Sequence, residues 1–451
     1  MIKRLLIANR GEIAVRIIRA CRELGIEAIV PYSESDAESL PVAMADRAVC
    51  IGPAGPARRS YLDIPSVLAA AEGTGADAVH PGYGFLAENP DFAAACADHG
   101  ITFVGPPARA IALMGDKIAA RKTVAGAGVP VVPGTEDPVA DAAQARSLAQ
   151  DIGPPVLLKA KAGGGGRGMR IIRKLADVGP AFEAASREAA AAFGDGALYI
   201  ERYLERVRHV EFQILADTRG NTVSLGERDC SIQRRHQKLI EEAPSPAVDA
   251  ALRAAMGEAA VKAAGTVDYV GAGTVEFLLD PADGTFYFIE MNTRIQVEHP
   301  VTEALTGIDL VVEQLRVASG EALSFAQSDI APAGHAIECR INAEDPARDF
   351  APGPGTIATY RPPGGAGVRV DSHCYQGYRV PPEYDSLLAK VIVHAPDRDR
   401  ALRRMRRALD EFVIKGIPTT IPFHLAMLDD PEFAAGDVTT DFLQRRGLDA
   451  G

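Results

Sequence analysis

The chain of 451 residues has no tryptophan, and its few cysteines are scattered without a CxxC pair: Cys21, Cys50, Cys96, Cys230, Cys339 and Cys374. Scattered cysteines in a chain of this size are typical of a reduced, intracellular protein and not of a disulfide framework or a zinc site. No apolar run approaches the ~20 residues that would cross a bilayer. The first ten residues are basic and then apolar, but Glu12 and Arg16 follow too soon for a signal peptide. We therefore expect a cytoplasmic protein.

Positive charge is also in short supply, with 48 lysines and arginines against 60 acidic residues and a net charge of -12. Such a balance repels the phosphates of nucleic acids and anionic membranes, so neither is expected as a partner. Two phosphate-binding patterns are missing as well: GxGxxG after the first strand, and the Gly-Lys-Ser/Thr end of a Walker A loop. Any phosphate site must therefore be a local basic cluster.

The beginning of the chain follows a strand-helix-strand rhythm. An apolar run at residues 4–8 is followed by apolar residues at helical spacing, which end at Gly25. Further strands are predicted at residues 26–30, 76–80 and 101–104. This alternation predicts a parallel α/β domain, and the chain is too long for a single core.

After Gly115 the pattern changes to a proline-containing linker and a small domain with a strand at residues 156–159. Alternating segments then predict an antiparallel sheet built from residues 198–204, 210–215, 274–279 and 286–290. The last hundred or so residues mix strand and helix. There a helix near residues 402–412 carries many arginines, which could form a solvated face or a docking site.

A predicted hairpin holds two acidic residues. The turn at residues 280–284 lies midway between Glu276 and Glu290, so a regular hairpin would place them opposite each other, about 5 Å apart. Two carboxylates at that distance repel unless a cation lies between them, and oxygen ligands of this kind suit magnesium. The alternative is a splayed, solvated pair.

Polar residues continue at every second position after this hairpin, in the series Glu290, Asn292, Arg294, Gln296 and Glu298. In an extended chain these five side chains share one face. Alternation can serve solubility alone, but carboxylates, amides and a guanidinium together are more typical of a binding site than of a solvent face.

Two further segments predict phosphate contacts. The glycines from Gly163 to Gly168 let backbone N–H groups approach anionic oxygens closely, although such runs also serve as linkers. The segment 233–238 is rich in cations, and in an extended chain His236 and Lys238 would share a face. With Lys117, Lys159 and the paired carboxylates, these segments predict ATP bound between two small domains, with magnesium on its phosphates.

The chain resembles biotin carboxylase of the ATP-grasp superfamily, almost end to end. The resemblance rests on Ile7–Ala14, His80–Phe85, Lys159 with Gly163–Arg170, Glu227–Lys238 and Glu290–Pro300. Residues Glu338–Glu344 add a motif of the biotin carboxylase C-terminal domain that other ATP-grasp enzymes lack. The resemblance implies a mixed α/β and α+β fold in three domains. These are a Rossmann-like domain at 1–114, an ATP-grasp domain at 115–330 with a mobile lid at 131–203, and a C-terminal domain at 331–451.

The resemblance also implies a nucleotide site. ATP phosphates would contact Lys117, Lys159, Gly165 and Gly166. Adenine would lie against Glu201, Arg202, Tyr203 and Leu204. Other nucleotide contacts would come from His209, Gln233 and His236. Magnesium, as two ions that manganese can replace, would be held by Glu276, Glu290 and Asn292. Arg202 stands where many members have lysine, and Lys161 where a small residue is usual.

The implied activity is ATP-dependent carboxylation of biotin through carboxyphosphate. Bicarbonate would bind to Lys238, Arg294, Gln296 and Val297. Glu298 would be the base and Arg340 would face the ureido oxygen of biotin. The implied partners are a biotin carboxyl carrier protein, a carboxyltransferase subunit and a second copy of the chain. Fatty acid synthesis is the expected setting, although the sequence leaves the final carboxyl acceptor open between acetyl-CoA, another acyl-CoA and a keto acid.

Two other functions remain open at this point. One is an ATP-grasp ligase that activates another carboxylate, which Glu338–Glu344 and His80–Phe85 argue against. The other is a nucleotide-binding subunit without catalysis, which the joint presence of Arg294, Glu298 and Arg340 argues against. We also expect the chain to carry no biotin itself, because its methionines do not flank a lysine and its last residues are typical of a domain end.

Overall fold

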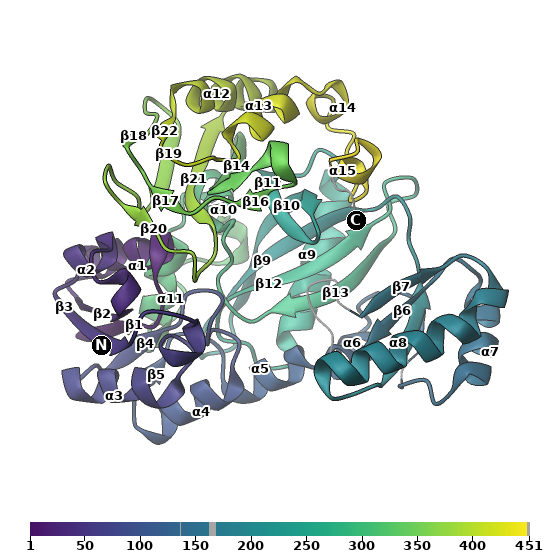
Figure 1. Ribbon diagram of the computed structural model, residues 1–451. Coiled ribbons are helices and arrows are strands. Elements are labelled where there is room, and N and C mark those ends of the chain that lie inside the picture. Colours follow the sequence, from purple (N-terminus) through teal and green to yellow (C-terminus); the bar gives the residue numbers. More distant parts are fainter. Residues whose placement is uncertain (136, 162–167, 449–451) are drawn as a thin grey trace.

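The computed structural model describes residues 1–135, 137–161 and 168–448 (Figure 1). In the view of Figure 1 the N-terminal part lies at the lower left, a small sheet with its helices projects at the lower right, and the C-terminal helices lie at the top. Gly165 and Gly166, predicted to contact phosphate, lie outside the described residues. Among the helices that are described, none is both long and apolar enough to cross a membrane.

The N-terminal part is built on a parallel sheet with the strand order β3-β2-β1-β4-β5. Its strands are β1 (Arg4–Ile7), β2 (Glu27–Ser33), β3 (Arg47–Gly52), β4 (Ala78–His80) and β5 (Thr102–Phe103). Its helices are α1 (Gly11–Leu24), α2 (Leu40–Met44), α3 (Ile64–Thr74), α4 (Pro90–Asp98) and α5 (Ala108–Gly115), with short 3-10 turns η1 (Glu34–Asp36) and η2 (Ala57–Arg59).

Side chains of β1 alternate between two layers of this domain. Leu5 and Ile7 pack with α1 on one face, whereas Leu6 packs with α3 and α4 on the other. Helix α1 ends at Gly25, whose φ of 70° is the left-handed conformation that glycine adopts without strain. The predicted parallel α/β domain is confirmed.

The segment predicted as a lid forms a separate three-stranded antiparallel sheet in the order β7-β6-β8. Its elements are β6 (Val156–Ala160), β7 (Met169–Ile172), β8 (Leu198–Arg202), α7 (Ala142–Ile152), η3 (Leu175–Asp177) and α8 (Val178–Phe193). Residues 198–204 were expected in the large antiparallel sheet, and that prediction is wrong. A strand pattern identifies a strand but not its partner, and here β8 pairs with β6.

The large sheet has eight strands in the order β13-β12-β9-β10-β11-β14-β21-β19, and every neighbouring pair is antiparallel. Its strands are β9 (Arg208–Ala216), β10 (Thr222–Arg234), β11 (Gln237–Ala243), β12 (Gly271–Leu279), β13 (Phe286–Asn292), β14 (His335–Asn342), β19 (Val368–Ser372) and β21 (Leu387–Ala395). The pairing of β11 with β14 carries the sheet across the predicted boundary at residue 330. The predicted boundaries themselves stay predictions.

Helices cover both faces of this sheet. On the outer face lie α9 (Ala250–Gly265), α12 (Arg398–Glu411) and α13 (Ile421–Asp429). On the inner face lie α10 (His299–Thr306), α11 (Leu310–Ala318) and the N-terminal domain, with α11 packed between α1 and β12. The inner face is where polar side chains gather, because Val210 and Phe212 of β9 point outward while His209 and Glu211 point inward.

Short elements complete the chain. Helix α6 (Lys117–Gly126) packs on β13 at the start of the middle part. The C-terminal part adds η4 (Gln327–Asp329), η5 (Pro346–Arg348), β15 (Glu344–Asp345), β16 (Ala351–Pro352), β17 (Gly355–Thr356), β18 (Thr359–Arg361), β20 (Arg379–Val380), β22 (Val413–Lys415), α14 (Pro431–Ala434) and α15 (Phe442–Arg445).

Candidate active site

A single large cavity of about 1270 Å³ lies where the N-terminal domain, the lid, the large sheet and the C-terminal part meet. All of the predicted site residues that the structure describes line it: Lys117, Lys159, Glu201, Arg202, Tyr203, Leu204, His209, Gln233, His236, Lys238, Glu276, Glu290, Asn292, Arg294, Gln296, Val297, Glu298 and Arg340. Residues far apart in the sequence are therefore brought to one place, although their location does not by itself assign their roles.

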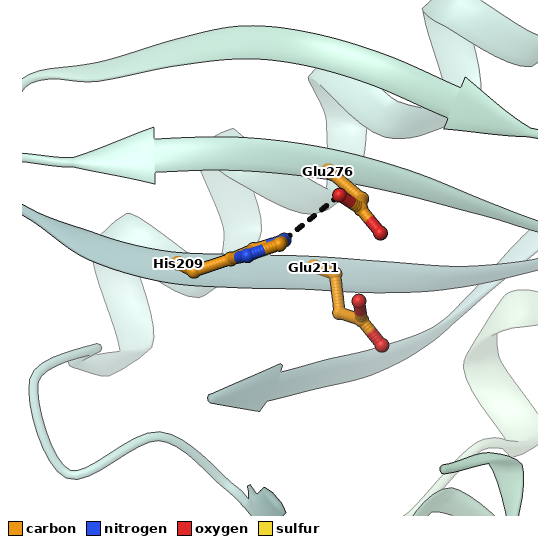
Figure 2. Close-up of side chains that lie close together, drawn as sticks. All are labelled: His209, Glu211 and Glu276. Carbon is orange, nitrogen blue, oxygen red and sulfur yellow. Dashed lines mark ion pairs between the residues drawn. The ribbon is translucent and has the colours of Figure 1, made fainter. Parts of the chain in front are cut away.

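Two neighbouring strands contribute a buried acid–base group (Figure 2). His209 and Glu211 lie two residues apart on β9, and Glu276 lies opposite Glu211 on β12. Figure 2 shows the imidazole of His209 directed at the carboxylate of Glu276, with an Nε2–Oε2 distance of 2.9 Å. Burial alone would lower the pKa of His209, but Glu276 reverses this and raises it. Burial would also raise the pKa of Glu276, yet Lys238 and His209 hold it well below its usual range.

Lys238 lies at the centre of the carboxylates. Its Nζ is 2.5 Å from Glu211, 2.9 Å from Glu276 and 2.7 Å from Glu298. Burial would lower the pKa of this lysine, but the three carboxylates raise it well above its usual value. The pairing of β10 with β11 is irregular here. Ile232 pairs with Ile240 and the next residue, Gln233, pairs with Lys238, so one extra residue lies on β11. Such a bulge re-aims a side chain next to a site.

Glu298 is held between two cations. Its carboxylate accepts hydrogen bonds from Lys238 at 2.7 Å and from Arg340 at 2.9 Å. Burial would raise the pKa of Glu298, but Lys238, Arg340 and Arg228 lower it, so this carboxylate is ionised at neutral pH. Arg340 also pairs with Glu241 at 2.5 Å. Burial raises the pKa of Glu241 to about 7, in spite of Arg340 beside it.

Sequence reasoning missed a fully buried arginine beneath this group. Arg228 has no exposed side-chain surface and donates to Glu211 at 2.5 Å, Gln213 at 2.7 Å, Thr302 at 3.0 Å and Thr274 at 3.1 Å. It thereby joins β10, β9, β12 and α10 below the cavity. A signal was present, since Arg228 belongs to the motif Glu227–Lys238, but a charge within a strand does not reveal which face is buried.

The chain after β13 is not extended as predicted. Strand β13 ends at Asn292, and residues 293–298 form bends and turns that lead into α10. Glu88 of the N-terminal domain holds this segment, because it accepts from the backbone N–H of Thr293 at 3.1 Å and from Nε of Arg294 at 3.0 Å. The predicted polar side chains nevertheless all line the cavity. Glu290 and Asn292 do so by alternation within β13, whereas Arg294, Gln296 and Glu298 are directed there by the turns.

Glu276 lies directly opposite Glu290 as predicted, but the hairpin is not regular, because a register shift between Glu276 and Phe277 leaves one extra residue on β13. Asn292 donates to Glu276 at 2.9 Å, and Lys117 lies 3.5 Å from Glu290. Carboxylate and amide oxygens are the donors that magnesium prefers, so this set fits that ion. Candidate metal-binding atoms of His209, Glu211 and Glu276 also lie within 4.8 Å of one another. There, however, the ammonium of Lys238 already contacts both carboxylates and supplies the compensating charge.

The lid side of the cavity is held by ion pairs and backbone hydrogen bonds. Lys159 pairs with Glu201 across β6 and β8. The backbone N–H groups of Arg202 and Tyr203 donate to the carbonyls of Pro133 at 2.8 Å and Pro155 at 3.0 Å. These two amides are therefore engaged within the lid and are not available to a ligand. Lys161 lies 3.9 Å from Asp116, at the start of α6.

His236 and Lys238 do not share a face of an extended segment, so that prediction is wrong. Arg235 and His236 form the turn between β10 and β11, with φ angles of 48° and 63°. Positive φ at both residues is typical of a tight hairpin turn. His236 therefore reaches the cavity from a hairpin tip, whereas Lys238 enters from the strand below.

Three family models match successive parts of the chain. The family model for the biotin carboxylase N-terminal domain matches residues 1–111, that for the ATP-binding domain of the carbamoyl-phosphate synthase L chain matches 116–326, and that for the biotin carboxylase C-terminal domain matches 338–445. Biotin carboxylase from Nostoc sp. is 59% identical over 441 residues, which cover 98% of each chain.

Solved structures are similar over the whole length. A β,γ-ATP complex of Campylobacter jejuni biotin carboxylase has a TM-score of 0.95 at 50% identity, covering 99% of both chains. The biotin carboxylase domain dimer of Hydrogenobacter thermophilus 2-oxoglutarate carboxylase has a TM-score of 0.94 at 50% identity, covering 100% of this chain and 99% of that one. That structure holds MgADP, ADP and bicarbonate.

Proposed function

The chain belongs to the biotin carboxylase family, whose enzymes carboxylate biotin with bicarbonate and ATP, and we propose how the residues of its cavity divide this reaction among themselves. The carboxylation of biotin follows from the family. The roles of single residues, the magnesium site and the partners are our proposals. The observation that carries them is the position of Glu298, a buried carboxylate between Lys238 and Arg340.

ATP lies between the lid and the large sheet in this proposal. Lys117 and Lys159 contact its phosphates, together with the backbone at Gly165 and Gly166. Glu201, Arg202, Tyr203 and Leu204 face the adenine, and His209, Gln233 and His236 complete the nucleotide contacts. The support is that the described residues of this set line one cavity with a lysine on each side of it. Nucleotide bound between two such lobes is shielded from water, which limits hydrolysis.

Magnesium is proposed to bind Glu276, Glu290 and Asn292, as two ions, with manganese as a substitute. The opposed carboxylates supply hard oxygen ligands next to Lys117, where phosphate oxygens complete the coordination. When bound, magnesium neutralises the charge that develops on the transferred phosphoryl group.

Bicarbonate is proposed to bind Lys238, Arg294, Gln296 and Val297, with Glu298 as the base. Glu298 takes the proton of bicarbonate while a bicarbonate oxygen attacks the γ-phosphorus of ATP, so that ADP leaves and carboxyphosphate forms. The low pKa of Glu298 in the ligand-free site keeps it ionised and ready to accept a proton. A bound bicarbonate anion competes for Lys238, and this competition raises the basicity of Glu298.

The second step transfers carbon dioxide. The bond between carbon and the bridging oxygen of carboxyphosphate breaks, which gives CO2 and phosphate. Phosphate takes the proton from N1 of biotin, and N1 attacks CO2. Arg340 donates to the ureido oxygen while negative charge develops there, in the manner of an oxyanion hole, which is typically worth roughly 10²–10³ in rate.

The variant Glu298→Gln tests this assignment. It should bind ATP normally, because Glu298 is assigned to bicarbonate, and it should lose most of its bicarbonate-dependent ADP release. An equal loss of ATP affinity would contradict the assignment. Offering other carboxylates in place of bicarbonate to the wild type separates this function from another ATP-grasp ligase, and turnover itself separates it from a subunit without catalysis.

The proposed partners are a separate biotin carboxyl carrier protein, a carboxyltransferase subunit and a second copy of the chain, in fatty acid synthesis in the cytoplasm. Six free cysteines support a reducing compartment. A neighbouring structure is a domain of a 2-oxoglutarate carboxylase, so a keto acid is the competing acceptor. Capture of a biotinylated carrier by the tagged chain, followed by identification of the transferase bound to it, decides between these acceptors.

A further inference from the structure

Lys390 is a completely buried lysine in the middle of β21. Its Nζ donates to the backbone carbonyl of Val297 at 2.7 Å and lies 3.1 Å from a carboxylate oxygen of Glu12, in the first turn of α1. Taking an ammonium group out of water costs several kcal/mol, and pairing offsets this only with good geometry. The chain therefore keeps a costly charge at a point where the C-terminal part, the N-terminal domain and the segment before α10 meet.

The carbonyl that Lys390 contacts belongs to the peptide between Val297 and Glu298. A peptide group is planar, so the carbonyl oxygen of Val297 and the N–H and Cα of Glu298 form one rigid unit. Glu298 is also the N-cap residue of α10, with φ and ψ of -82° and 8°, so the helix fixes its other side. Holding this oxygen therefore determines where the Glu298 side chain begins.

The neighbouring strand acts on the same residue from its other end. Arg340 on β14 lies directly opposite Lys390 on β21, so the two cations share one face of the sheet. Arg340 donates to the Glu298 carboxylate at 2.9 Å, while Lys390 donates to the backbone just before Glu298. One cross-strand pair thus holds both the carboxylate and the main chain of this residue.

We propose that Lys390 is a positioning residue of the carboxylation reaction, which fixes the peptide between Val297 and Glu298 and thereby sets the bicarbonate site and its base. The inference rests on the proposed role of Glu298. Lys390 has no exposed surface and does not reach a substrate itself. Its counter-ion Glu12 accepts a hydrogen bond from Tyr83, which lines the cavity, so the N-terminal domain is joined to the same point.

The variant Lys390→Met keeps the apolar length of the side chain and removes its N–H donors. If Lys390 positions Glu298, kcat/KM for bicarbonate should fall about 10- to 100-fold, because displacing a reacting group by about 1 Å can cost roughly 10²-fold in rate. The dissociation constant for ATP should stay unchanged, because the nucleotide contacts lie elsewhere in the cavity. A purely structural ion pair would instead lower the melting temperature and the active fraction without changing the KM for bicarbonate.

A second variant guards against loss of folding. Lys390→Met alone leaves Glu12 buried without its cation, so Lys390→Met with Glu12→Gln removes this ion pair as a unit, which is usually better tolerated. Glu338 and Asp371 also lie near Lys390 and stay in both variants, so the two variants differ only at Glu12. The matched control is Arg253→Met, which breaks an ion pair with buried Glu227 on the outer face of the sheet, beside α9. The control should lower the melting temperature and leave bicarbonate kinetics unchanged.

Steady-state ADP release, measured against bicarbonate and against ATP for all four proteins, gives the answer. Slower turnover with a raised KM for bicarbonate in the two Lys390 variants, together with an unchanged dissociation constant for ATP, supports the inference. Wild-type bicarbonate kinetics in the folded double variant, or ATP binding weakened as much as the use of bicarbonate, would overturn it alone. Absence of bicarbonate-dependent ADP release from the wild type would overturn the proposed function and the inference with it.

Discussion

Replacement of Lys238 by methionine should reverse the way in which the stability of the protein depends on pH. Lys238 contacts Glu211, Glu276 and Glu298 within 2.9 Å, and these three carboxylates are nearly or completely buried. Without the ammonium they remain close together in a site that excludes water. Removing one partner of a buried ion pair typically costs about 3–5 kcal/mol. For unfolding of the whole chain we expect a fall in melting temperature of roughly 3–5 °C.

The sign of the pH dependence follows from the pKa shifts. In the wild type the pKa values of Glu276 and Glu298 are lowered, so their stabilising contribution is complete above the ordinary glutamate pKa and is lost only as the pH falls through the lower folded values. Between pH 5 and 8 Glu276 and Glu298 therefore leave stability almost constant. Glu211 is the exception, because burial raises its pKa already in the wild type. In Lys238→Met, burial and mutual repulsion dominate and raise the pKa values of Glu276 and Glu298. Stability should then be highest at low pH and fall as the pH rises.

Thermal unfolding followed between pH 5 and 8 measures this slope. The control is Lys262→Met, which removes an exposed lysine paired with Glu258 on α9 and should change stability by less than about 1 kcal/mol at any pH. A Lys238→Met protein that melts like the wild type, with the same pH dependence, would refute the reasoning that this lysine compensates the buried carboxylates.

The remaining predictions concern single steps of the reaction. Glu290→Gln should raise the magnesium concentration needed for activity and lower turnover severely without altering the melting temperature, since Glu290 is partly exposed; full activity at ordinary magnesium would contradict the metal site. Arg340→Lys should slow biotin carboxylation roughly 10²-fold while ATP affinity is kept, and an unchanged rate would remove Arg340 from the transfer step. Lys159→Met should raise the KM for ATP and leave that for bicarbonate unchanged, and the opposite pattern would mean that the lid lysine was misassigned.

The N-terminal domain and the pairing of β12 with β13 were accessible from the sequence because their determinants are local. Helix α1 is marked by its apolar spacing and by Gly25. The turn between β12 and β13 sets their pairing, since the length of a hairpin loop sets the register of its strands. That register alone would place Glu276 opposite Ile289, and one extra residue on β13 brings Glu290 opposite Glu276 instead. In both cases the partner segments are close along the chain.

The other features depend on contacts between distant segments. Strand β8 has an ordinary strand pattern, but its place in the lid depends on β6, and the extension of the large sheet through β14 and β21 joins residues on both sides of a predicted boundary. Arg228 and Lys390 resemble solvated charges in sequence, because burial is decided only when α10 and α1 pack over the sheet. The left-handed turn at His236 likewise contradicts a local pattern that favours an extended chain.

The central claim is that bicarbonate, activated by ATP in this cavity, supplies the carboxyl group of biotin. Bicarbonate labelled with ¹⁸O tests it directly, with phosphate and carboxybiotin analysed after turnover with free biotin. Because bicarbonate oxygen attacks the γ-phosphorus and stays on phosphorus when carboxyphosphate breaks, the phosphate released should carry one labelled oxygen from bicarbonate. Phosphate that takes its new oxygen from water instead would mean that ATP is merely hydrolysed, and the account would be wrong.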